Sequence, residues 1–237
     1  MVIDCIEENF EDLHKKLKKV NIVHGISTNV GKTYTTALLL KKLNLKFKEN
    51  FAIKPVISGF DENDYQSSDN FYLLQASGIK EPTLKQVKEI SKYLLSQPLS
   101  PDIAAKKQGI AIHFDEIITF CEANISQIKE SERIFIEMAG GVCSPCSNSH
   151  TMADISNALL HHSPCNILVT VPYLGSLSHT ISALKVLKFD VVIVNKANSE
   201  AGEEFVWSLK NHLNHEIEII ESQPKVLDIP APLLYFA

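Results

Sequence analysis

The 237-residue sequence contains no apolar run of about 18 residues, the length that a membrane-spanning helix needs. It does not open with a basic stretch followed by an apolar one, as an export signal does. It also has no excess of basic residues, because 23 Lys and Arg stand against 28 Asp and Glu, with a net charge of −5 and an isoelectric point near 6.0. These absences argue against a membrane, a nucleic acid or an anionic lipid surface as partner. We therefore expect a cytoplasmic protein that acts on small molecules.

Cysteine and histidine occur without the usual spacing of a metal site. Among five cysteines, Cys143 and Cys146 form C-S-P-C, but no second pair follows at zinc spacing, and no thioredoxin-like helix opens there. We expect neither a metal nor a redox role for this pair. His161 and His162 end a predicted helix before a Ser-Pro pair, where cationic side chains favour the helix C-terminus. A solvated helix cap is the prediction for them.

Short β-branched runs alternate with longer helical patterns, the order typical of parallel βαβ units. We predict strands over residues 21–24, 51–57, 133–137, 166–171, 190–194 and 216–220, and helices over residues 32–45, 68–77, 113–129, 151–161, 178–187 and 201–212. Several strands are apolar throughout, as in N-I-L-V-T-V, which indicates helices on both faces of the sheet. With an apolar fraction of 45%, the chain is predicted to form a single-domain α/β fold with a mostly parallel sheet.

The first 20 residues stand apart from this alternation. Apolar side chains recur there at helical spacing between acids and lysines, namely Ile3, Ile6, Phe10, Leu13 and Leu17. We predict an N-terminal amphipathic helix over residues 1–20, packed on the body of the protein or on a neighbouring subunit. Residues 21–237 are predicted to form the α/β domain.

The stretch V-H-G-I-S-T-N-V-G-K-T-Y-T-T, residues 23–36, departs by one residue from the phosphate-binding pattern G-x-x-x-x-G-K-[ST]. Five residues, not four, separate Gly25 from Gly31. The context nevertheless fits, since a predicted strand precedes the loop and a predicted helix follows it, with bare N–H groups that favour an anion. Gly31 allows a phosphate close to the backbone, Lys32 can follow the β- and γ-phosphates, and Thr33 can offer a hydroxyl to Mg²⁺. The sequence thus predicts a P-loop with one extra residue.

Polar side chains follow two further predicted strands, at the edge where open parallel sheets bind their ligands. Lys54 and Ser58 lie in F-A-I-K-P-V-I-S-G, where the proline holds the preceding lysine extended. Glu137 ends the strand R-I-F-I-E, and Asp69 begins a predicted helix. With Thr33, these two carboxylates would suffice for Mg²⁺, although Asp69 could instead be a helix N-cap or a solvated surface acid.

The motifs G-x-S-T-N-V-G-K-T, K-P-V-I-S-G, S-S-D-N, E-M-A-G-G, Y-L-G-S-L-S-H-T and V-I-V-N follow one another from about residue 21 to residue 224. This set resembles the dethiobiotin synthetases, whose loop also has five residues between the glycine and G-K-T. The resemblance implies a P-loop NTPase-like fold, Mg²⁺ as cofactor, ATP as co-substrate and a homodimer. It also implies a ligase reaction of biotin synthesis, in which carbon dioxide forms a carbamate on diaminopelargonate, ATP phosphorylates it and a cyclic urea closes.

By this resemblance, Lys32 would follow the transferred phosphoryl group, and Lys54 would hold the carbamate and the γ-phosphate together. Ser58 would contact the substrate, with Thr28 and Ser100 as further candidates. The distant carboxylate of the substrate would bind at the start of a helix, in a turn that comes from the partner subunit in the family. That turn is Gly175, Ser176, Leu177 and Ser178.

The resemblance also implies a set of nucleotide-binding residues. They are Asn29, Val30, Gly31, Lys32, Thr33, Tyr34, Asp69, Glu137, Met138, Ala139, Gly140, Asn195, Lys196 and Pro224, with Thr33, Asp69 and Glu137 as the metal ligands.

The stretch V-N-K-A-N, residues 194–198, favours adenine over guanine. It is similar to the guanine-reading N-K-x-D, but Asn198 replaces the aspartate, and an amide cannot accept hydrogen bonds with both ends. Asn195 offers one donor and one acceptor, which matches N6 and N7 of adenine, although it could also be a turn residue at a strand end. Pro224 would line the adenine, but the I-I-E-S-Q before it lacks the glycine of the family.

Departures from the family keep other classes open. Ser27, Thr28 and Asn29 remove two charges beside the phosphates, and Asp102 replaces a histidine and would bring negative charge towards an anionic substrate. Met138 replaces a glycine and is expected to narrow the pocket. The alternatives are a non-catalytic nucleotide-binding relative and a switch or partitioning-type ATPase that acts through protein partners. The latter needs a second lysine early in the loop and a D-x-x-G, and neither stands at the required place.

Overall fold

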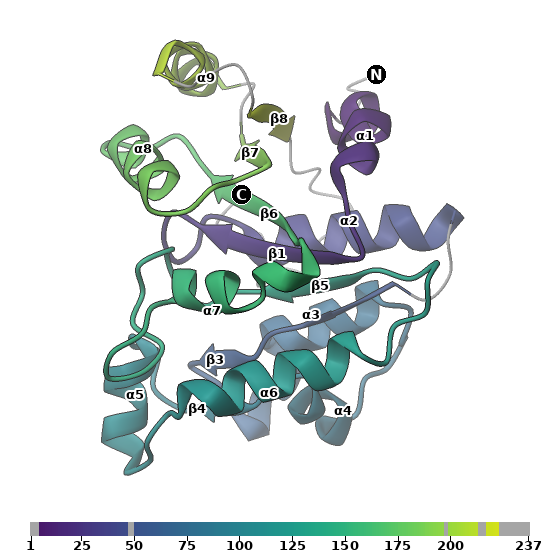
Figure 1. Ribbon diagram of the computed structural model, residues 1–237, viewed down its shortest axis with the longest axis vertical. Coiled ribbons are helices and arrows are strands. Elements are labelled where there is room, and N and C mark those ends of the chain that lie inside the picture. The colour runs from purple at the N-terminus through teal and green to yellow at the C-terminus, as the bar shows by residue number, and fades with distance from the viewer. Residues whose placement is uncertain (1–4, 47–49, 197–198, 213–216, 223–237) are drawn as a thin grey trace.

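A six-stranded parallel sheet forms the centre of the computed structural model, which describes residues 5–46, 50–196, 199–212 and 217–222 (Figure 1). The strand order is β2-β5-β1-β6-β7-β8. The strands are β1 (Val20–Gly25), β2 (Phe51–Ile53), β5 (Ile134–Glu137), β6 (Cys165–Thr170), β7 (Val191–Asn195) and β8 (Glu218–Ser222). The α/β fold with a parallel sheet is therefore confirmed.

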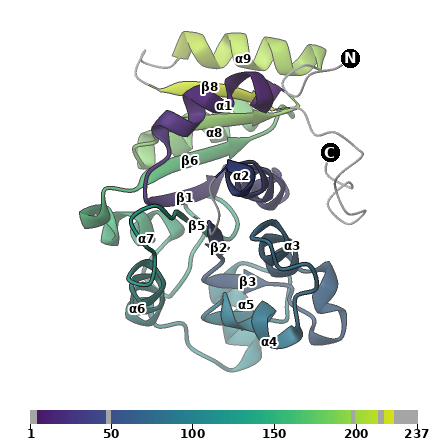
Figure 2. The same cartoon turned by 90° about the vertical axis from the view of Figure 1, so that its right-hand side faces the viewer.

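Helices cover both faces of this sheet (Figure 2). They are α1 (Cys5–Lys16), α2 (Lys32–Lys46), α3 (Asp69–Ala76), α4 (Leu84–Glu89), α5 (Pro101–Gln108), α6 (Phe114–Ile125), α7 (Met152–Ala158), α8 (Ser176–Val186) and α9 (Glu200–His212), with the 3-10 helices η1 (Glu62–Ser67) and η2 (Leu160–His162). Successive strand residues point to opposite faces. Phe135 packs in one cluster with residues of α1, α2 and α3, while its neighbours Ile134 and Ile136 pack in another with residues of α6 and α7. None of the described helices is long and apolar enough to cross a bilayer.

The single strand predicted over residues 51–57 is wrong, because the chain forms two strands there. β2 ends at Ile53, and β3 (Val56–Ser58) pairs with β4 (Tyr93–Leu95) in a separate two-stranded sheet. Pro55 has no N–H to donate to a ladder, so pairing with β5 stops before it. The small sheet lies with α3, α4 and α5 at the lower end of Figure 1. The sequence predicted neither β4, α4, α5 nor η1, which are all short.

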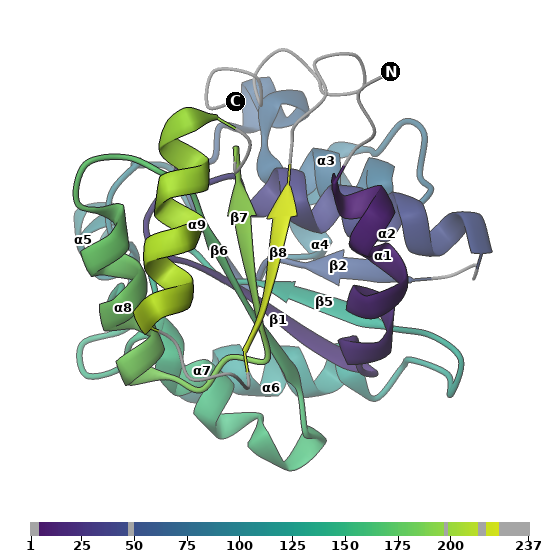
Figure 3. The same ribbon diagram turned by 90° about the horizontal axis from the view of Figure 1, so that it is seen from above.

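The N-terminal helix α1 packs on the body of its own chain. Phe10, Leu13 and Leu17 are buried, and they share a cluster with apolar residues of α2 and of the sheet. Figure 3 shows α1 and α9 on opposite sides of β8. Of the five predicted apolar positions, Ile3 lies outside the described residues.

We predict that Leu13→Ala lowers the free energy of unfolding by about 2–5 kcal/mol, because the side chain is fully buried and its removal leaves a cavity. Leu45→Ala on α2 is the matched control, since it makes the same helical substitution at a side chain that is 87% exposed. Urea unfolding of both variants measures the difference. Equal losses of unfolding free energy in the two variants would contradict a stabilising role of the buried Leu13 side chain.

Candidate active site

The P-loop, residues 25–31, joins β1 to α2 and folds around the side chain of Lys32. A Cβ atom at Gly25 would lie 2.7 Å from Val30 Cγ2 and 3.0 Å from Lys32 Nζ, so only glycine fits there. Asn29 has a φ of 62°, in the left-handed region that asparagine enters more readily than most residues. The extra residue of the loop is thus accommodated by Gly25 and by the conformation of Asn29.

Asn195, at the end of β7, holds the other end of the P-loop. Its Nδ2 donates a hydrogen bond to the Val30 carbonyl oxygen at 2.8 Å, and its amide lies against the Thr35 hydroxyl. A Cβ atom at Gly31, where φ is 87°, would lie 2.5 Å from that Nδ2. The side chain is only 4% exposed, so in this structure it stabilises the loop. Its contact with adenine stays a prediction, as does that of Lys196 beside it.

Lys32 begins α2, and its ammonium is held inside the site. Nζ donates hydrogen bonds to the carbonyl oxygens of Ser27 and Gly140, both at 2.8 Å. Burial, and then the charge of Lys54, lowers the pKa of Lys32 to about 8, although the charges of Glu137 and Asp69 act in the opposite direction. Two neutral carbonyls do not compensate a buried cation, so an anionic group beside this nitrogen is strongly favoured.

Lys54 lies between two carboxylates at the end of β2. Its Nζ donates hydrogen bonds to Glu137 Oε1 at 2.7 Å and to Asp69 Oδ2. Burial alone would lower the pKa of Lys54, but the charges of Asp69 and Glu137 outweigh it and raise the pKa above its ordinary value. Burial likewise would raise the pKa of Asp69, and the charge of Lys54 outweighs it and lowers that pKa. The lysine is therefore charged and fixed in direction.

The predicted metal ligands lie around this cluster. Thr33 Oγ1, in the first turn of α2, donates a hydrogen bond to Glu137 Oε1 at 2.7 Å, so α2 and the residue after β2 both meet β5 at this oxygen atom. Glu137 is fully buried, and its Oε2 has no hydrogen-bond partner among the described residues. A buried carboxylate oxygen without a donor, a neighbouring hydroxyl and the second carboxylate of Asp69 form an oxygen set of the kind that Mg²⁺ prefers. The residues present therefore fit a magnesium ion.

A cavity of about 770 Å³ opens over the P-loop, and both lysines line it. Twelve of the site residues that the sequence predicted line this cavity, namely Thr28, Asn29, Gly31, Lys32, Thr33, Tyr34, Lys54, Ser58, Asp69, Ser100, Ala139 and Gly140. Ser58 Oγ is buried and has no hydrogen-bond partner among the described residues. Ser100 Oγ donates a hydrogen bond to Asp102 Oδ1 at 2.5 Å. The carboxylate of Asp102, which stands where the family has a histidine, therefore orients the Ser100 hydroxyl.

Other predicted site residues lie away from this cavity. Gly175, Ser176, Leu177 and Ser178 form the start of α8 and do not line it, and Ser176 is buried with its Oγ bonded to the Tyr173 carbonyl oxygen. Val30 is buried behind the loop. Pro224 and Asn198 lie outside the described residues.

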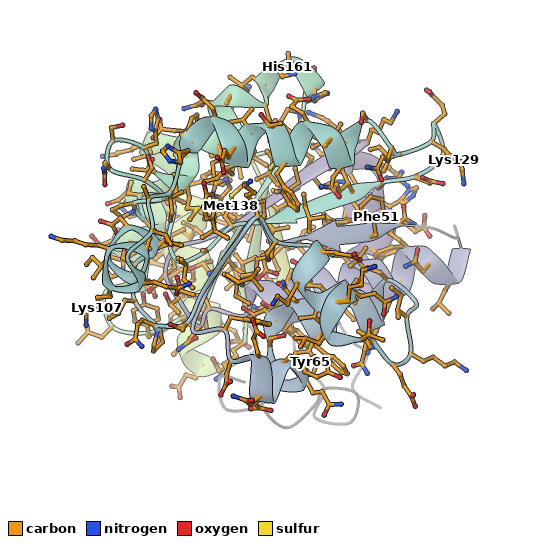
Figure 4. All side chains as sticks on the ribbon, turned by 90° about the horizontal axis from the view of Figure 1, so that it is seen from below. Phe51, Tyr65, Lys107, Lys129, Met138 and His161 are labelled. Atoms are coloured by element: carbon orange, nitrogen blue, oxygen red, sulfur yellow. The ribbon has the colours of Figure 1, made fainter. Side chains whose placement is uncertain are left out.

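The expectation that Met138 narrows the pocket is wrong. The side chain is 1% exposed and belongs to the apolar cluster of α6 and α7, and it does not line the cavity. Figure 4 labels Met138 near the centre of the molecule. Its φ is not positive, so a glycine-like backbone is not required. Met138 therefore contributes to packing rather than to the shape of the site.

The sequence missed part of the cavity wall. The additional lining residues are Gly59, Ser67, Pro98, Leu99, Pro101 and Ser144. Ser144 Oγ accepts a hydrogen bond from the Gly141 N–H at 2.7 Å and so shapes the turn after β5. The stretch Q-P-L-S-P around Ser100 could have indicated this part of the wall. Its place in the fold is set by β4, however, and the sequence did not predict that strand.

Behind the P-loop, His24 is fully buried in β1. Its Nε2 lies 2.7 Å from Ser156 Oγ, and its ring meets Phe189 edge to face. Burial, and then the charge of Lys32, lowers the pKa of His24 to about 3. The imidazole is therefore neutral in the folded protein above that pH.

A phosphate-binding loop and two buried lysines at the carboxyl edge of a parallel sheet place this chain among the P-loop nucleotide-binding proteins. The family model of an AAA domain, AAA_26, matches residues 19–227. The chain is 36% identical over 186 residues to the ATP-dependent dethiobiotin synthetase BioD of Phenylobacterium zucineum (strain HLK1), with 76% of this chain and 77% of that one covered. It is 28% identical over 227 residues to the ATP-dependent dethiobiotin synthetase BioD of Vibrio cholerae serotype O1, with 90% of this chain and 89% of that one covered. The chain belongs to the dethiobiotin synthetase family.

Solved structures are similar at a lower level. The signal recognition particle receptor FtsY from Elizabethkingia anophelis is 15% identical with a TM-score of 0.48, over 94% of this chain and 63% of that one.

We predict that Gly31→Ala weakens ATP binding at least about tenfold, which corresponds to about 1.4 kcal/mol. The new methyl group would displace the Asn195 amide that holds the loop. Gly78→Ala is the matched control, because φ is 101° there but nothing lies within 4 Å of the added Cβ. Both variants carry backbone strain of about 1–2 kcal/mol, and only the first should lose affinity in calorimetric titration with ATP. An equal loss of affinity in both would contradict a specific role of the contact.

We predict that His24→Asn makes the protein less sensitive to acid. The unfolded state binds a proton at His24 below pH 6.5 and the folded state only below about pH 3, so stability is fully present above pH 6.5 and falls as the pH drops. Between pH 7 and pH 5, the original protein should lose about 2 kcal/mol more unfolding free energy than the variant. Urea unfolding at both pH values measures this, with His212→Asn at an exposed position as control. Parallel losses in all three proteins would contradict the prediction.

Proposed function

We propose that this chain is an ATP-dependent dethiobiotin synthetase, a ligase that forms C–N bonds and closes the cyclic urea of dethiobiotin. One observation carries the proposal: Lys32, at the start of α2, and Lys54, directly after β2, line the same cavity beside Thr33, Asp69 and Glu137. The substrates are diaminopelargonate, carbon dioxide and ATP, and Mg²⁺ is the cofactor.

The reaction crowds negative charge at one point. An amine nitrogen adds to carbon dioxide and loses a proton, which gives a carbamate. A carbamate oxygen then bonds to the γ-phosphorus of ATP while the bond to ADP breaks. The second amine attacks the carbamate carbon and loses a proton, the bond from that carbon to the phosphate oxygen breaks, phosphate leaves, and the urea ring closes. Catalysis of such steps consists mainly of positioning and electrostatic stabilisation.

The charged residues meet these requirements in distinct ways. Lys32, whose buried ammonium donates to two neutral carbonyl oxygens, stabilises the transferred phosphoryl group. Lys54 bridges the carbamate and the γ-phosphate, held in direction by Asp69 and Glu137. Thr33, Asp69 and Glu137 would hold Mg²⁺, which neutralises phosphate charge when bound.

Two serines support the placement of the diamine. Ser58 lines the cavity, and its buried hydroxyl has no hydrogen-bond partner among the described residues, which leaves it available for a hydrogen bond to the substrate. The Ser100 hydroxyl donates its hydrogen bond to Asp102, so its oxygen offers only lone pairs to the cavity, and these can accept a hydrogen bond from an amine N–H. Asp102 thereby favours binding of the amine end of the substrate. The sequence had instead suggested repulsion between Asp102 and an anionic substrate.

A homodimer in the cytoplasm completes the proposal. The turn from Gly175 to Ser178 is outside the cavity of its own chain and so is free to close that of a partner. Beside it, Tyr173 and Leu174 are exposed, and Leu174 is fully exposed to solvent, which supports burial of this region in an interface.

We predict that the purified protein, given ATP, Mg²⁺, bicarbonate and diaminopelargonate, produces dethiobiotin and one ADP per product, measured by mass spectrometry. Lys54→Met should lower kcat by about a hundredfold or more, because a preorganised charge at the reacting oxygens is lost. Lys107→Met is the matched control, since this lysine of α5 extends into solvent in Figure 4 and should leave kcat unchanged.

The outcomes separate the classes of protein. ADP release without the cyclic urea would indicate a switch or partitioning-type ATPase, and nucleotide binding without turnover a non-catalytic relative. Circular dichroism and ATP affinity of Lys54→Met serve as tests of its folding. A variant that binds ATP normally and retains full kcat would refute the role of Lys54.

A further inference from the structure

A second cluster of ligand-type side chains lies outside the ATP cavity, where η2 meets α6. The Nε2 atom of His161 lies 3.0 Å from Glu122 Oε1, and that of His162 lies 2.7 Å from Glu122 Oε2. The sequence predicted two solvated imidazoles at a helix end. Instead, both rings turn towards one carboxylate that is 40 residues away along the chain.

The local structure holds this arrangement in place. Cys121 and Ile125 of α6 and Ile155 and Leu159 of the α7 segment belong to one buried cluster, so the two backbones are fixed relative to each other. Leu159 immediately precedes η2. The two rings have centroids 4.1 Å apart and are tilted by 42°, not stacked face to face. The position of Glu122 and the positions of the histidines are therefore set by packing rather than by their own hydrogen bonds.

The three ligand atoms are close enough to share one ion. One nitrogen of each histidine and one carboxylate oxygen all lie within 4.8 Å of one another. A metal ion at 2.0–2.2 Å from each ligand requires ligand atoms about 3–4 Å apart, which a small rotation of these side chains provides. Two imidazoles and one carboxylate suit zinc and its neighbours among the divalent transition metals, whereas Mg²⁺ prefers oxygen ligands alone.

We propose that Glu122, His161 and His162 form a binding site for a divalent transition-metal ion of the zinc type. The ion replaces the hydrogen bonds of the two Nε2 atoms to the carboxylate, and water completes its coordination, because His161 is 61% exposed. The bound ion joins α6 to the segment that leads from α7 into β6, and it stabilises the folded state.

This site is independent of the proposed ligase activity. None of its three residues lines the ATP cavity, and Figure 4 shows His161 at the periphery of the molecule while Met138 lies near its centre. Its donor set also differs from the oxygen set of Thr33, Asp69 and Glu137.

The test is a titration of the untagged, full-length protein with Co²⁺ in the presence of saturating Mg²⁺ and ATP, followed by visible absorption. We expect one equivalent of Co²⁺ to bind with d–d bands of a site that contains imidazole nitrogen. Glu122→Gln, which keeps an acceptor for an imidazole N–H, should lower the affinity about a hundredfold, and the double variant His161→Gln, His162→Gln should abolish these bands. His212→Gln, an exposed histidine at the end of α9, is the matched control and should bind as the original protein does.

A second measurement separates metal binding from hydrogen bonding. Zn²⁺ at a hundredfold excess over its Kd should raise Tm by about 5 °C in the original protein and in His212→Gln, but not in Glu122→Gln. Ligase turnover of Glu122→Gln should be unchanged, so a failure of this proposal leaves the proposed function untouched. The proposal is overturned if no stoichiometric Co²⁺ binding occurs, or if binding persists in the double variant and therefore belongs to other groups such as the exposed thiol of Cys143.

Discussion

The structure depends on charge that is buried and compensated at the carboxyl edge of one sheet. Glu137 is completely buried, and isolated from its partners it would be very costly to ionise. The Lys54 ammonium and the Thr33 hydroxyl both bind its Oε1, so three elements are brought together by one oxygen atom. Lys32 lies beside this cluster, and its Nζ donates to the carbonyl oxygens of Ser27 and Gly140. Two lysines and two carboxylates therefore form one charged cluster beside the P-loop.

Pro55 connects this electrostatic centre to the shape of the cavity. Pairing of β2 with β5 ends at Ile53, so Lys54 lies just beyond the sheet edge and Pro55 leads the chain into the small sheet of β3 and β4. Ser58 of β3 and Ser100, which lies between β4 and α5, both line the cavity. One residue without an N–H thus separates the phosphate side of the site from the side where we place the diamine.

Departures from the family pattern look different once the tertiary contacts are known. Met138 fills the apolar core instead of the pocket, and Asn29 adopts a left-handed conformation that suits its side chain. Asp102 holds the Ser100 hydroxyl, which gives the carboxylate a partner within the wall of the site. The sequence alone kept a non-catalytic relative open because of these positions, since the direction of each side chain is not encoded in a motif.

The sequence by itself determined the parallel α/β fold, the P-loop and the acids and lysine at the strand ends, because hydrophobic periodicity and strand-to-helix order are local properties. Tertiary structure alone decided that Lys54 lies between Asp69 and Glu137, that Asn195 holds the loop, and that His161 and His162 meet Glu122. Short elements such as β4 were also not predicted from the sequence, because three residues are too few for a periodic pattern. These features arise from contacts between segments far apart in the chain, and the free energy of such contacts depends on packing that no single stretch of sequence contains.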